Sequence, residues 1–316
     1  MQRYHDTLEL SPEHLGAVIA IGNFDGVHLG HQAVIARAQS IAAAKNAPFG
    51  VMTFEPHPRQ YFGERKGELT SPFRLMGPMA RAHRLEKLGV TFVIEVPFGA
   101  SLAAKSAEAF ARDLIVDAVR ASHVVVGADF HFGQGREGDG TRLVSLGAEL
   151  GFGVDVATMV DFGGAEISST SIRHALSEGR PRDAAQMLGH WHRLEGTVAH
   201  GDKRGRDLGY PTANIPLGDL HIPRFGVYAV LVDVLTGPHQ GSYSGAASIG
   251  VRPTFGAQAP NCETYLFDFE GDLYGAIISV GLVSYLRDEE RFDGVEALIT
   301  QMGADCAQAR SLLSAL

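Results

Sequence analysis

From Ala17 to about Val160, short apolar runs alternate with longer segments in which apolar residues recur every three or four positions. The short runs have the length and composition of buried strands, and the longer segments have the period of helices. The predicted strands are AVIAI from Ala17, PFGVMTF from Pro48, TFVIEV from Thr91, HVVVG from His123 and VDVATMV from Val154. Helices are expected between the first two strands, at 74–88 and 102–118, and, as shorter elements, around 171–178 and 181–188. This alternation predicts β-α-β units around a parallel sheet, in a Rossmann-like α/β fold.

After about Gly189 the pattern changes to closely spaced strands that are separated by Gly and Pro. Such strands favour a small closed β-barrel, because closure removes exposed sheet edges. The predicted strands are LEGTVA, ANIPL, GVYAVLVDV, YSGAASIG, CETYLFDF and IISVGLVSYL. One C-terminal helix is expected to pack on the barrel through Val295, Leu298, Ile299, Met302, Cys306 and Leu313. We therefore predict two domains, at 1–187 and 188–316.

The composition fits a folded enzyme of two domains. The chain has 316 residues, of which 45% are hydrophobic and 20% charged. Its net charge of −9 argues against a nucleic-acid partner, because binding the phosphate backbone needs clustered Lys and Arg. The first residues lack an apolar signal-peptide core and no 18-residue apolar run follows, so no membrane partner is expected. With only two cysteines, a disulfide framework is excluded and a cytoplasmic protein is predicted; homo-oligomer formation stays open.

The run GNFDGVHLGH, from Gly22 to His31, separates the first predicted strand from the first helix. Ligands of open α/β sheets bind beyond the carboxyl ends of strands, where a helix N-terminus offers N–H groups to phosphate. Glycines let the backbone approach a ligand, and His28 and His31 can stabilise charge on a triphosphate. Alternatively, both histidines only make local bonds at the helix start. Three glycines, Asp25 and two histidines at one turn favour a nucleotide site.

Two further segments follow later strands and are expected at the same sheet edge. FEPHP, which contains His57, follows the second strand, although it is also typical of a proline-stiffened loop. VGADFHFG follows the fourth strand and offers Asp129 as an acceptor. Its phenylalanines, Phe130 and Phe132, are equally compatible with ligand stacking and with core packing.

The segment ISSTSIR carries Ser168, Ser169 and Thr170 before a predicted helix, with Arg173 one turn inside. A hydroxyl at this position is an ordinary helix N-cap. Hydroxyls with a guanidinium also form a phosphate clamp, and the two interpretations are compatible.

In the second half, GTVAHGDKRGRDLGYPTANIPL begins at Gly196. Its basic, glycine-containing loop can fold over phosphates, although a charged run alone is more often an exposed hairpin. The loop residues of interest are Gly201, Lys203, Gly205 and Arg206.

Thr212 and Asn214 lie two apart in a predicted strand, so both side chains point to one face. A hydroxyl and an amide there can bind Mg²⁺ when ATP phosphates supply the negative charge. Glu263 opens another strand and is the candidate general base, although a glutamate at a strand end is usually only solvated.

Together, GNFDGVHLGH, PHP, DFHFG and SSTSIR resemble the FMN adenylyltransferase module of the prokaryotic-type bifunctional riboflavin kinase/FAD synthetases. The module is similar to the H-x-G-H nucleotidylyltransferases, and the order of all four elements is more specific than any one. The resemblance implies that FMN lies near His57 and Asp129. It implies ATP binding to Gly22, Phe24, His28, His31, Ser169, Thr170 and Arg173.

From Gly196 to Phe292 the chain resembles the riboflavin kinase family through GDKRGRDLGYPTAN, GVYA, SIGVRPTFG, ETYLFDFEGDLYG and LRDEERF. This resemblance implies Mg²⁺ and ATP coordination by Thr212 and Asn214, and a catalytic base at Glu263. It places flavin at the LRDEERF loop, including Arg287 and Glu290. Tyr210 stands where Phe is more usual and Arg291 where Lys is common, which leaves affinity in doubt rather than activity.

The resemblance implies phosphorylation of riboflavin to FMN in the C-terminal half and adenylylation of FMN to FAD in the N-terminal half. Both steps are expected to use ATP and Mg²⁺. Residue patterns alone indicate two ATP-phosphate sites, and only the resemblance names flavin. The alternatives are one active half, adenylylation of another cofactor precursor, and a non-catalytic flavin-binding protein.

Overall fold

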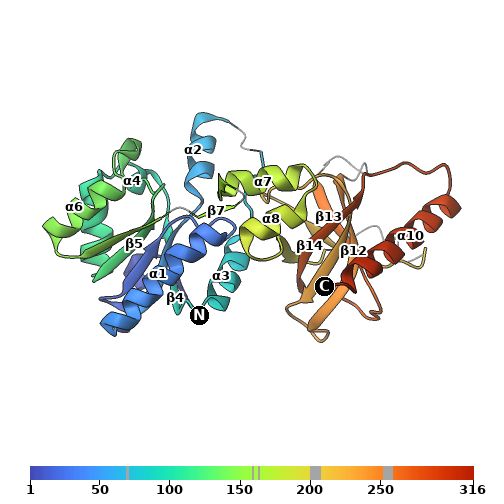
Figure 1. The fold of residues 1–316 in the computed structure, drawn as a ribbon, viewed down its shortest axis with the longest axis horizontal. Coiled ribbons are helices and arrows are strands. Elements are labelled where there is room, and N and C mark those ends of the chain that lie inside the picture. The colour runs from blue at the N-terminus through green and yellow to red at the C-terminus, as the bar shows by residue number, and fades with distance from the viewer. Residues whose placement is uncertain (69–70, 159, 163, 200–207, 252–258) are drawn as a thin grey trace. The chain divides into compact units, whose positions relative to one another are not determined.

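The protein is described from a computed structural model that covers residues 1–68, 71–158, 160–162, 164–199, 208–251 and 259–316. The chain forms two compact units, which are coloured along the sequence in Figure 1. The first unit contains Met1–Thr70 and Pro78–Ser168, and the second contains Ser71–Gly77 and Ser169–Leu316.

The first unit is built on a six-stranded sheet in which every neighbouring pair of strands is parallel. The strand order is β1-β4-β3-β2-β5-β6. The strands are β1 (Gln2–Tyr4), β2 (Val18–Ile21), β3 (Phe49–Glu55), β4 (Phe92–Pro97), β5 (His123–Gly127) and β6 (Gly153–Ala157). The five predicted strands and the parallel sheet are confirmed, and β1 adds an edge strand that was not predicted. The order reverses at β2, whose neighbours are β3 and β5, and ligands bind at such switch points.

Helices and short turns connect these strands. They are η1 (Thr7–Glu9), η2 (Pro12–His14), α1 (Leu29–Lys45), α2 (Pro58–Lys66), α3 (Pro78–Lys87), α4 (Ala100–Ala103), α5 (Ala107–Phe110), η3 (Ala111–Ala118), η4 (Gln134–Arg136) and α6 (Gly140–Leu150). A small hairpin of β7 (Asp161–Phe162) and β8 (Ala165–Glu166) follows β6. Both faces of the sheet are apolar, as expected for a parallel sheet that helices cover on both sides.

The single helix predicted at 102–118 is wrong in detail. The structure instead has α4, α5 and the π-helical η3 in succession. The interruption follows from Ser106, whose hydroxyl accepts a hydrogen bond from the N–H of Ala109 and so starts a new helix.

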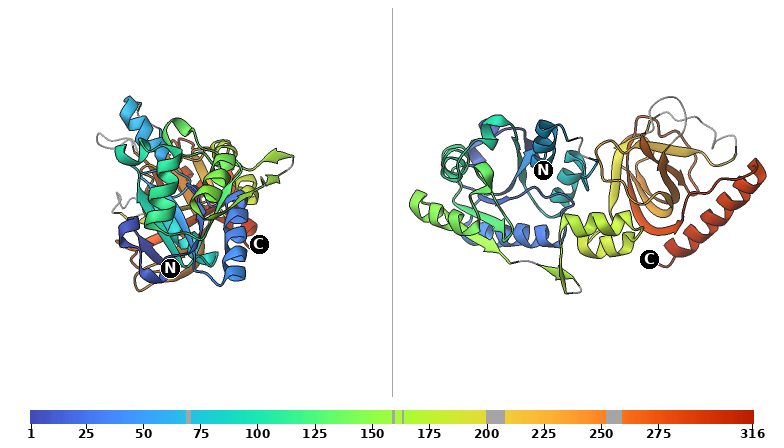
Figure 2. Two further views of the ribbon diagram at one scale, coloured as in Figure 1. Left: turned by 90° about the vertical axis from the view of Figure 1, so that its left-hand side faces the viewer. Right: turned by 90° about the horizontal axis from the view of Figure 1, so that it is seen from above.

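The second unit is a curled antiparallel sheet of order β10-β13-β12-β11-β14-β9, preceded in the chain by two helices (Figure 2). These elements are α7 (Ser169–Ser177), α8 (Pro181–Leu188), β9 (Arg193–Thr197), β10 (Thr212–Pro216), β11 (Gly226–Val234), β12 (Gly241–Val251), β13 (Pro260–Leu266), β14 (Ile277–Arg287) and α10 (Val295–Leu313). Two residues after the end of β9, Ala199 forms a bridge to Asn214 of the other edge strand, β10, with its N–H 2.9 Å from the carbonyl of Asn214. The predicted barrel and C-terminal helix are confirmed.

Alternation along the strands separates the inside of the barrel from its outside. Inward residues such as Ala213, Ile215, Val230, Ile249 and Cys262 form one buried cluster. A second cluster on the outside contains Ala229, Ala246, Phe267 and Ala309, the last of which belongs to α10. The C-terminal helix therefore covers part of the outer face of the sheet.

Candidate functional site

The loop between β2 and α1 has an unusual backbone. Phe24, Gly26 and Val27 all have positive φ, of 51°, 90° and 44°. This conformation is strained for Phe and more so for the β-branched Val27, yet both side chains are fully buried. Hydrogen bonds hold the turn: the N–H of Val27 donates to the carbonyl of Phe24, and Nε2 of Gln32 donates to the carbonyl of Val27. Such strain is typical of ligand-binding turns.

His28 and His31 lie together at the start of α1. Their rings are stacked with centroids 3.6 Å apart, and Nδ1 of His28 accepts a hydrogen bond of 3.3 Å from the N–H of His31. His28 is thus a helix N-cap, as the alternative interpretation expected. The other ring nitrogen of His28, Nε2, takes no part in this capping bond.

The second histidine, His31, is half-buried. Burial, with a smaller contribution from His28, lowers the pKa of His31 well below its ordinary value. Its Nδ1 has no hydrogen-bond partner in the described part of the chain. His31 therefore presents a neutral imidazole at neutral pH, which can donate a hydrogen bond but brings no full charge.

His57 and Asp129 follow β3 and β5, the neighbours of β2 in the sheet. His57 caps α2, because its Nδ1 accepts a hydrogen bond of 3.1 Å from the N–H of Arg59. The segment is therefore a helix start with proline in its first turn rather than only a stiffened loop. Asp129 is exposed, and a Cβ added at Gly127 would come within 2.9 Å of its Oδ1.

The phenylalanines of DFHFG belong mainly to the core. Phe132 is buried in the main cluster, and Phe130 stacks on it with a centroid distance of 5.5 Å. A more accessible aromatic ring, Phe62, lies on α2 with 46% of its surface exposed and edge contacts to Tyr61 and Phe98. Sequence reasoning missed Phe62, because the helix that presents it was not predicted.

Ser169, Thr170 and Arg173 lie on α7, in the second unit. Arg173 donates from Nη2 to the hydroxyl of Thr170 at 3.2 Å and from Nη1 to the carbonyl of Phe73 at 3.4 Å. His221, between β10 and β11, contacts the carbonyl of Arg173 at 3.0 Å and the hydroxyl of Ser177 at 3.2 Å. The arginine is therefore held within its own unit at both its backbone and its side chain.

A row of polar residues crosses the outside of the barrel. Asn214 of β10 is paired in register with Glu263 of β13, which is paired in turn with Ser248 of β12. Directly opposed residues have Cβ atoms about 5 Å apart. Because Ala213 and Cys262 face the inside, these polar side chains and Thr212 share the outer face. The register thus places Asn214 directly beside Glu263, with Thr212 on the same face of β10.

A second carboxylate, Glu289, adjoins this row and was missed by sequence reasoning. A Cβ added at Gly250, two residues along β12 from Ser248, would come within 2.0 Å of its Oε1. Burial, together with the negative charge of Glu263, raises the pKa of Glu289. Glu289 lies beyond the end of β14 at Arg287, so only the folded structure reveals this neighbour. The predicted flavin contact, Glu290, is the next residue, and both glutamates are exposed.

Arg287 ends β14 and is engaged by the C-terminal helix. Its Nε and Nη2 donate to the carboxylate of Asp305 at 2.9 and 2.7 Å, and its Nη1 donates to the carbonyl of Asp288. The guanidinium carbon lies 5.7 Å from the ring centre of Phe292. The structure thus gives Arg287 a structural role between β14 and α10.

Both halves of the sequence match known enzyme families. The FAD synthetase family matches residues 10–171 and the riboflavin kinase family residues 188–313. Bifunctional riboflavin kinase/FMN adenylyltransferases are 42% identical in Pseudomonas fluorescens, over 99% of this chain and 98% of the relative, and 40% identical in Escherichia coli K12, over 93% and 92%. The chain belongs to the bifunctional riboflavin kinase/FMN adenylyltransferase family. It is an enzyme with the transferase domains of both activities.

A solved structure confirms the fold over nearly the whole length. It is that of a protein from Streptococcus pneumoniae described as a macrolide-efflux protein, with 30% identity, 96% coverage of both chains and a TM-score of 0.81. The description as an efflux protein applies to the Streptococcus protein alone. Within the described residues of this family member, no helix is both long and apolar enough to cross a bilayer.

The kinase loop residues Gly201, Lys203, Gly205 and Arg206 lie outside the described residues.

The side chains of Thr212 and Asn214 offer the oxygen ligands that Mg²⁺ prefers. Thr212 offers a hydroxyl oxygen and Asn214 an amide oxygen, which also accepts from Nδ2 of Asn261 at 3.3 Å. Mg²⁺ takes few protein oxygens when nucleotide phosphates complete its shell. In the part of the chain that the structure covers, no three His, Cys, Asp or Glu side chains form a metal cluster.

Proposed function

We propose that the domain at 188–316 transfers the γ-phosphate of ATP to riboflavin, and that the domain at 1–187 then adenylylates the resulting FMN. The supporting observation is that each half has its own family match and its own set of candidate phosphate-binding groups. In the first half that set is the strained turn with His28 and His31. In the second half it is Thr212 and Asn214, which share one face of β10 and act on the phosphates through Mg²⁺.

In the kinase step, Glu263 accepts the proton of the ribityl 5′-hydroxyl as this oxygen attacks the γ-phosphorus of ATP. The bond from the γ-phosphorus to the bridging oxygen breaks, and ADP leaves. Thr212 and Asn214 are the proposed protein ligands of Mg²⁺, which when bound neutralises charge on the phosphates.

The basic loop of Gly201, Lys203, Gly205 and Arg206 is proposed to bind the ATP phosphates in this step, and the loop of Arg287 and Glu290 is proposed to contact the flavin. The anchoring of Arg287 by Asp305 supports a fixed loop start at the end of β14. These roles rest on the family resemblance.

In the adenylylation step, a phosphate oxygen of FMN attacks the α-phosphorus of ATP and pyrophosphate leaves. No covalent enzyme intermediate is needed. His28 and His31 are proposed to stabilise the charge on the phosphate oxygens by hydrogen bonds, with Gly22 and Phe24 lining the nucleotide site. Because the pKa of His31 is lowered, it acts as a neutral donor.

The other ligands of this step are likewise proposals. FMN is placed near His57 and Asp129, which follow the strands on either side of β2. Ser169, Thr170 and Arg173 are assigned to ATP. The hydrogen bond from Arg173 to Thr170 supports a prearranged hydroxyl and guanidinium pair on α7.

We also propose a cytoplasmic location, which gives access to ATP. The state of the cysteines supports it, because Cys262 and Cys306 are both free. Burial raises the pKa of Cys262 to about 12, so this thiol is unreactive. We propose neither a nucleic-acid nor a membrane partner, and a homo-oligomer stays open.

A time course with purified protein, riboflavin, ATP and Mg²⁺ tests the proposal. FMN is expected first and FAD later by chromatography, and chelation of Mg²⁺ with EDTA is expected to stop both steps. FMN offered with ATP separates the second step from the first. Tight binding of flavin without consumption of ATP would instead indicate a non-catalytic flavin-binding protein.

A further inference from the structure

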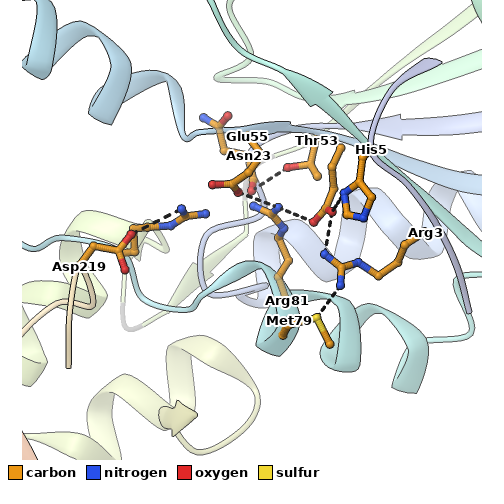
Figure 3. Close-up of polar contacts among 10 residues, drawn as sticks. Arg3, His5, Asn23, Thr53, Glu55, Met79, Arg81 and Asp219 are labelled. Atoms are coloured by element: carbon orange, nitrogen blue, oxygen red, sulfur yellow. Dashed lines mark hydrogen bonds and ion pairs between the residues drawn. The ribbon is translucent and has the colours of Figure 1, made fainter. Parts of the chain in front are cut away.

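A buried ion network lies at the carboxyl ends of β3 and β4 in the first unit (Figure 3). Arg81 of α3 is 2% exposed, and its Nη2 lies 3.2 Å from Oε2 of Glu55 and 3.1 Å from Oε1 of Glu95. Glu95 is 3% exposed, and its other oxygen accepts from Nη2 of Arg3 at 2.7 Å. His5 lies 3.3 Å from the same oxygen. One guanidinium thus joins two carboxylates from neighbouring strands.

The two carboxylates differ in their surroundings. Glu95 has two arginines around it and is enclosed in the interior, so its pairing balances a buried charge. The Glu55 side chain is 28% exposed and is the last residue of β3, directly before Pro56 and His57. Its carbonyl accepts a hydrogen bond of 2.9 Å from the N–H of Phe98. Glu55 is therefore fixed at both its backbone and its carboxylate where the chain leaves the sheet.

The same strand also contacts the nucleotide loop. Thr53, which is in register with Glu95, donates from its hydroxyl to the carbonyl of Asn23 at 3.2 Å. Asn23 belongs to the strained turn before His28. The end of β3 thus carries one contact to the proposed ATP turn, through Thr53, and one to the network, through Glu55.

A buried ion pair is weak evidence for a role in stability. Well-packed apolar side chains of similar size often give the folded protein equal or greater stability, because the cost of desolvating the charges offsets their attraction. A charged pair has an advantage where direction matters, because hydrogen-bonded geometry fixes the position of the backbone that carries the carboxylate. The backbone fixed here leads directly into His57.

We propose that Arg81 and Glu55 are positioning residues for the adenylylation step, which set the start of the His57 turn and so the placement of FMN. This inference rests on the proposed function of the first domain. Neither residue is assigned to the reacting atoms. A displacement of about 1 Å in a substrate-positioning group can lower the reaction rate about 100-fold. Loss of the fixed turn start is therefore expected to have a measurable effect on adenylylation.

The test uses the full-length chain with Glu55→Ala, which removes the tether but leaves the more buried Arg81–Glu95–Arg3 contacts. We expect kcat/KM for FMN to fall about 10-fold or more, mainly through a higher KM for FMN. The KM for ATP in the same reaction and the rate of riboflavin phosphorylation are expected to stay unchanged. Glu55→Gln, which keeps a hydrogen-bond acceptor for Arg81, is expected to recover most of the loss.

Arg37→Gln is the matched control, because it breaks another ion pair of the same unit, with Asp155, and is expected to leave the KM for FMN unchanged. An unchanged KM for FMN in Glu55→Ala overturns the inference. An equal rise of both KM values with a lower Tm, or no recovery in Glu55→Gln, also overturns it, because the network is then only structural. A wild-type enzyme that makes no FAD from FMN overturns the proposed function itself, which separates the two failures.

Discussion

Glu263 lies between Asn214 and Ser248 in the register of three adjacent strands. A carboxylate at this place has a hydroxyl and an amide within reach, and Glu289 as a like-charged neighbour whose pKa is raised. Glu263 therefore lies inside a row of polar side chains, next to the proposed Mg²⁺ ligand Asn214, and is not an isolated residue at a strand end.

Glu263→Gln keeps the size of the side chain and one hydrogen-bond acceptor but removes the base. We expect kcat for riboflavin phosphorylation to fall by about 10²–10⁴-fold, the usual contribution of a general base. Conversion of added FMN to FAD is expected to stay near the wild-type rate. Separate chromatographic assays of the two steps measure this, and a kinase rate within a few fold of wild type would exclude Glu263 as the base.

His192 precedes β9 and is 2% exposed. Burial, followed by the charges of His221 and His190, lowers its pKa to about 3. The unfolded chain takes up a proton below about pH 6.5, whereas the folded chain does not, so the free energy of unfolding falls as the pH falls. One such histidine accounts for about 1.4 kcal/mol between pH 7.5 and 5.5.

His192→Leu is therefore expected to reduce the difference in unfolding free energy between pH 7.5 and 5.5 by about that amount. Denaturant unfolding followed by tryptophan fluorescence measures it, because the single tryptophan, Trp191, lies in the same unit. His174→Leu, at a histidine whose side chain is 69% exposed, is the control. The same pH difference in His192→Leu as in wild type would contradict the assignment.

Individual residues were predictable from the sequence where a motif surrounds them. His28, His31, Thr212 and Asn214 were named from local spacing alone, and the structure places each pair on one turn or one face. Arg81 and Glu289 were not predicted, because their partners lie on other strands and only the fold brings them together.

Among the elements, the edge strands β9 and β10 complete the barrel only over a short stretch. Their close approach requires a glycine, because a Cβ added at Gly196 would lie 2.5 Å from Cγ2 of Ile215. Ile215 is fully buried in the barrel core and has little room to move. The strand pattern predicted both elements, but their meeting could not be inferred from either strand alone.

Gly196→Ala is expected to lower the free energy of unfolding of the second unit by about 1–3 kcal/mol, the usual cost of overpacking. Gly241→Ala, on β12, is the control, because its nearest atoms, in the ring of Tyr243, lie at an ordinary 3.6 Å. Its effect is expected within about 0.5 kcal/mol. Trp191 fluorescence in denaturant follows both variants, and equal effects would show that closure is not tight at Gly196.

Helices that begin at unusual residues were the hardest elements to predict. The start of α2 at Pro58 and the split of the 102–118 segment at Ser106 both depend on capping, which a hydrophobic period does not record. In the buried parallel sheet, where apolar runs are continuous, four of the five predicted strands match the observed bounds to within one residue. The prediction VDVATMV extends past Ala157, where β6 ends.

For the whole molecule, the sequence predicted two unlike folds and the structure has them. The two compact units differ from the two predicted domains. The second unit contains Ser71–Gly77, α7 and α8 as well as the barrel. Hydrogen bonds explain this: the N–H groups of Phe73 and Arg74 donate to the carbonyl of Asp219, and His221 holds α7. Side-chain and loop contacts of this kind have no periodic signal in a sequence.

Two separate folds with separate candidate sites predict that the activities can be lost one at a time. In the double variant His28→Ala, His31→Ala, adenylylation of FMN is expected to fall by about 10²–10³-fold or more, because charge-stabilising groups are removed. Phosphorylation of riboflavin is expected to stay unchanged, since no kinase residue is altered. Riboflavin, ATP and Mg²⁺ then give FMN that accumulates without FAD, the reverse of the Glu263→Gln result. Loss of both activities, with Trp191 fluorescence still reporting a folded barrel, would mean that the two sites depend on each other.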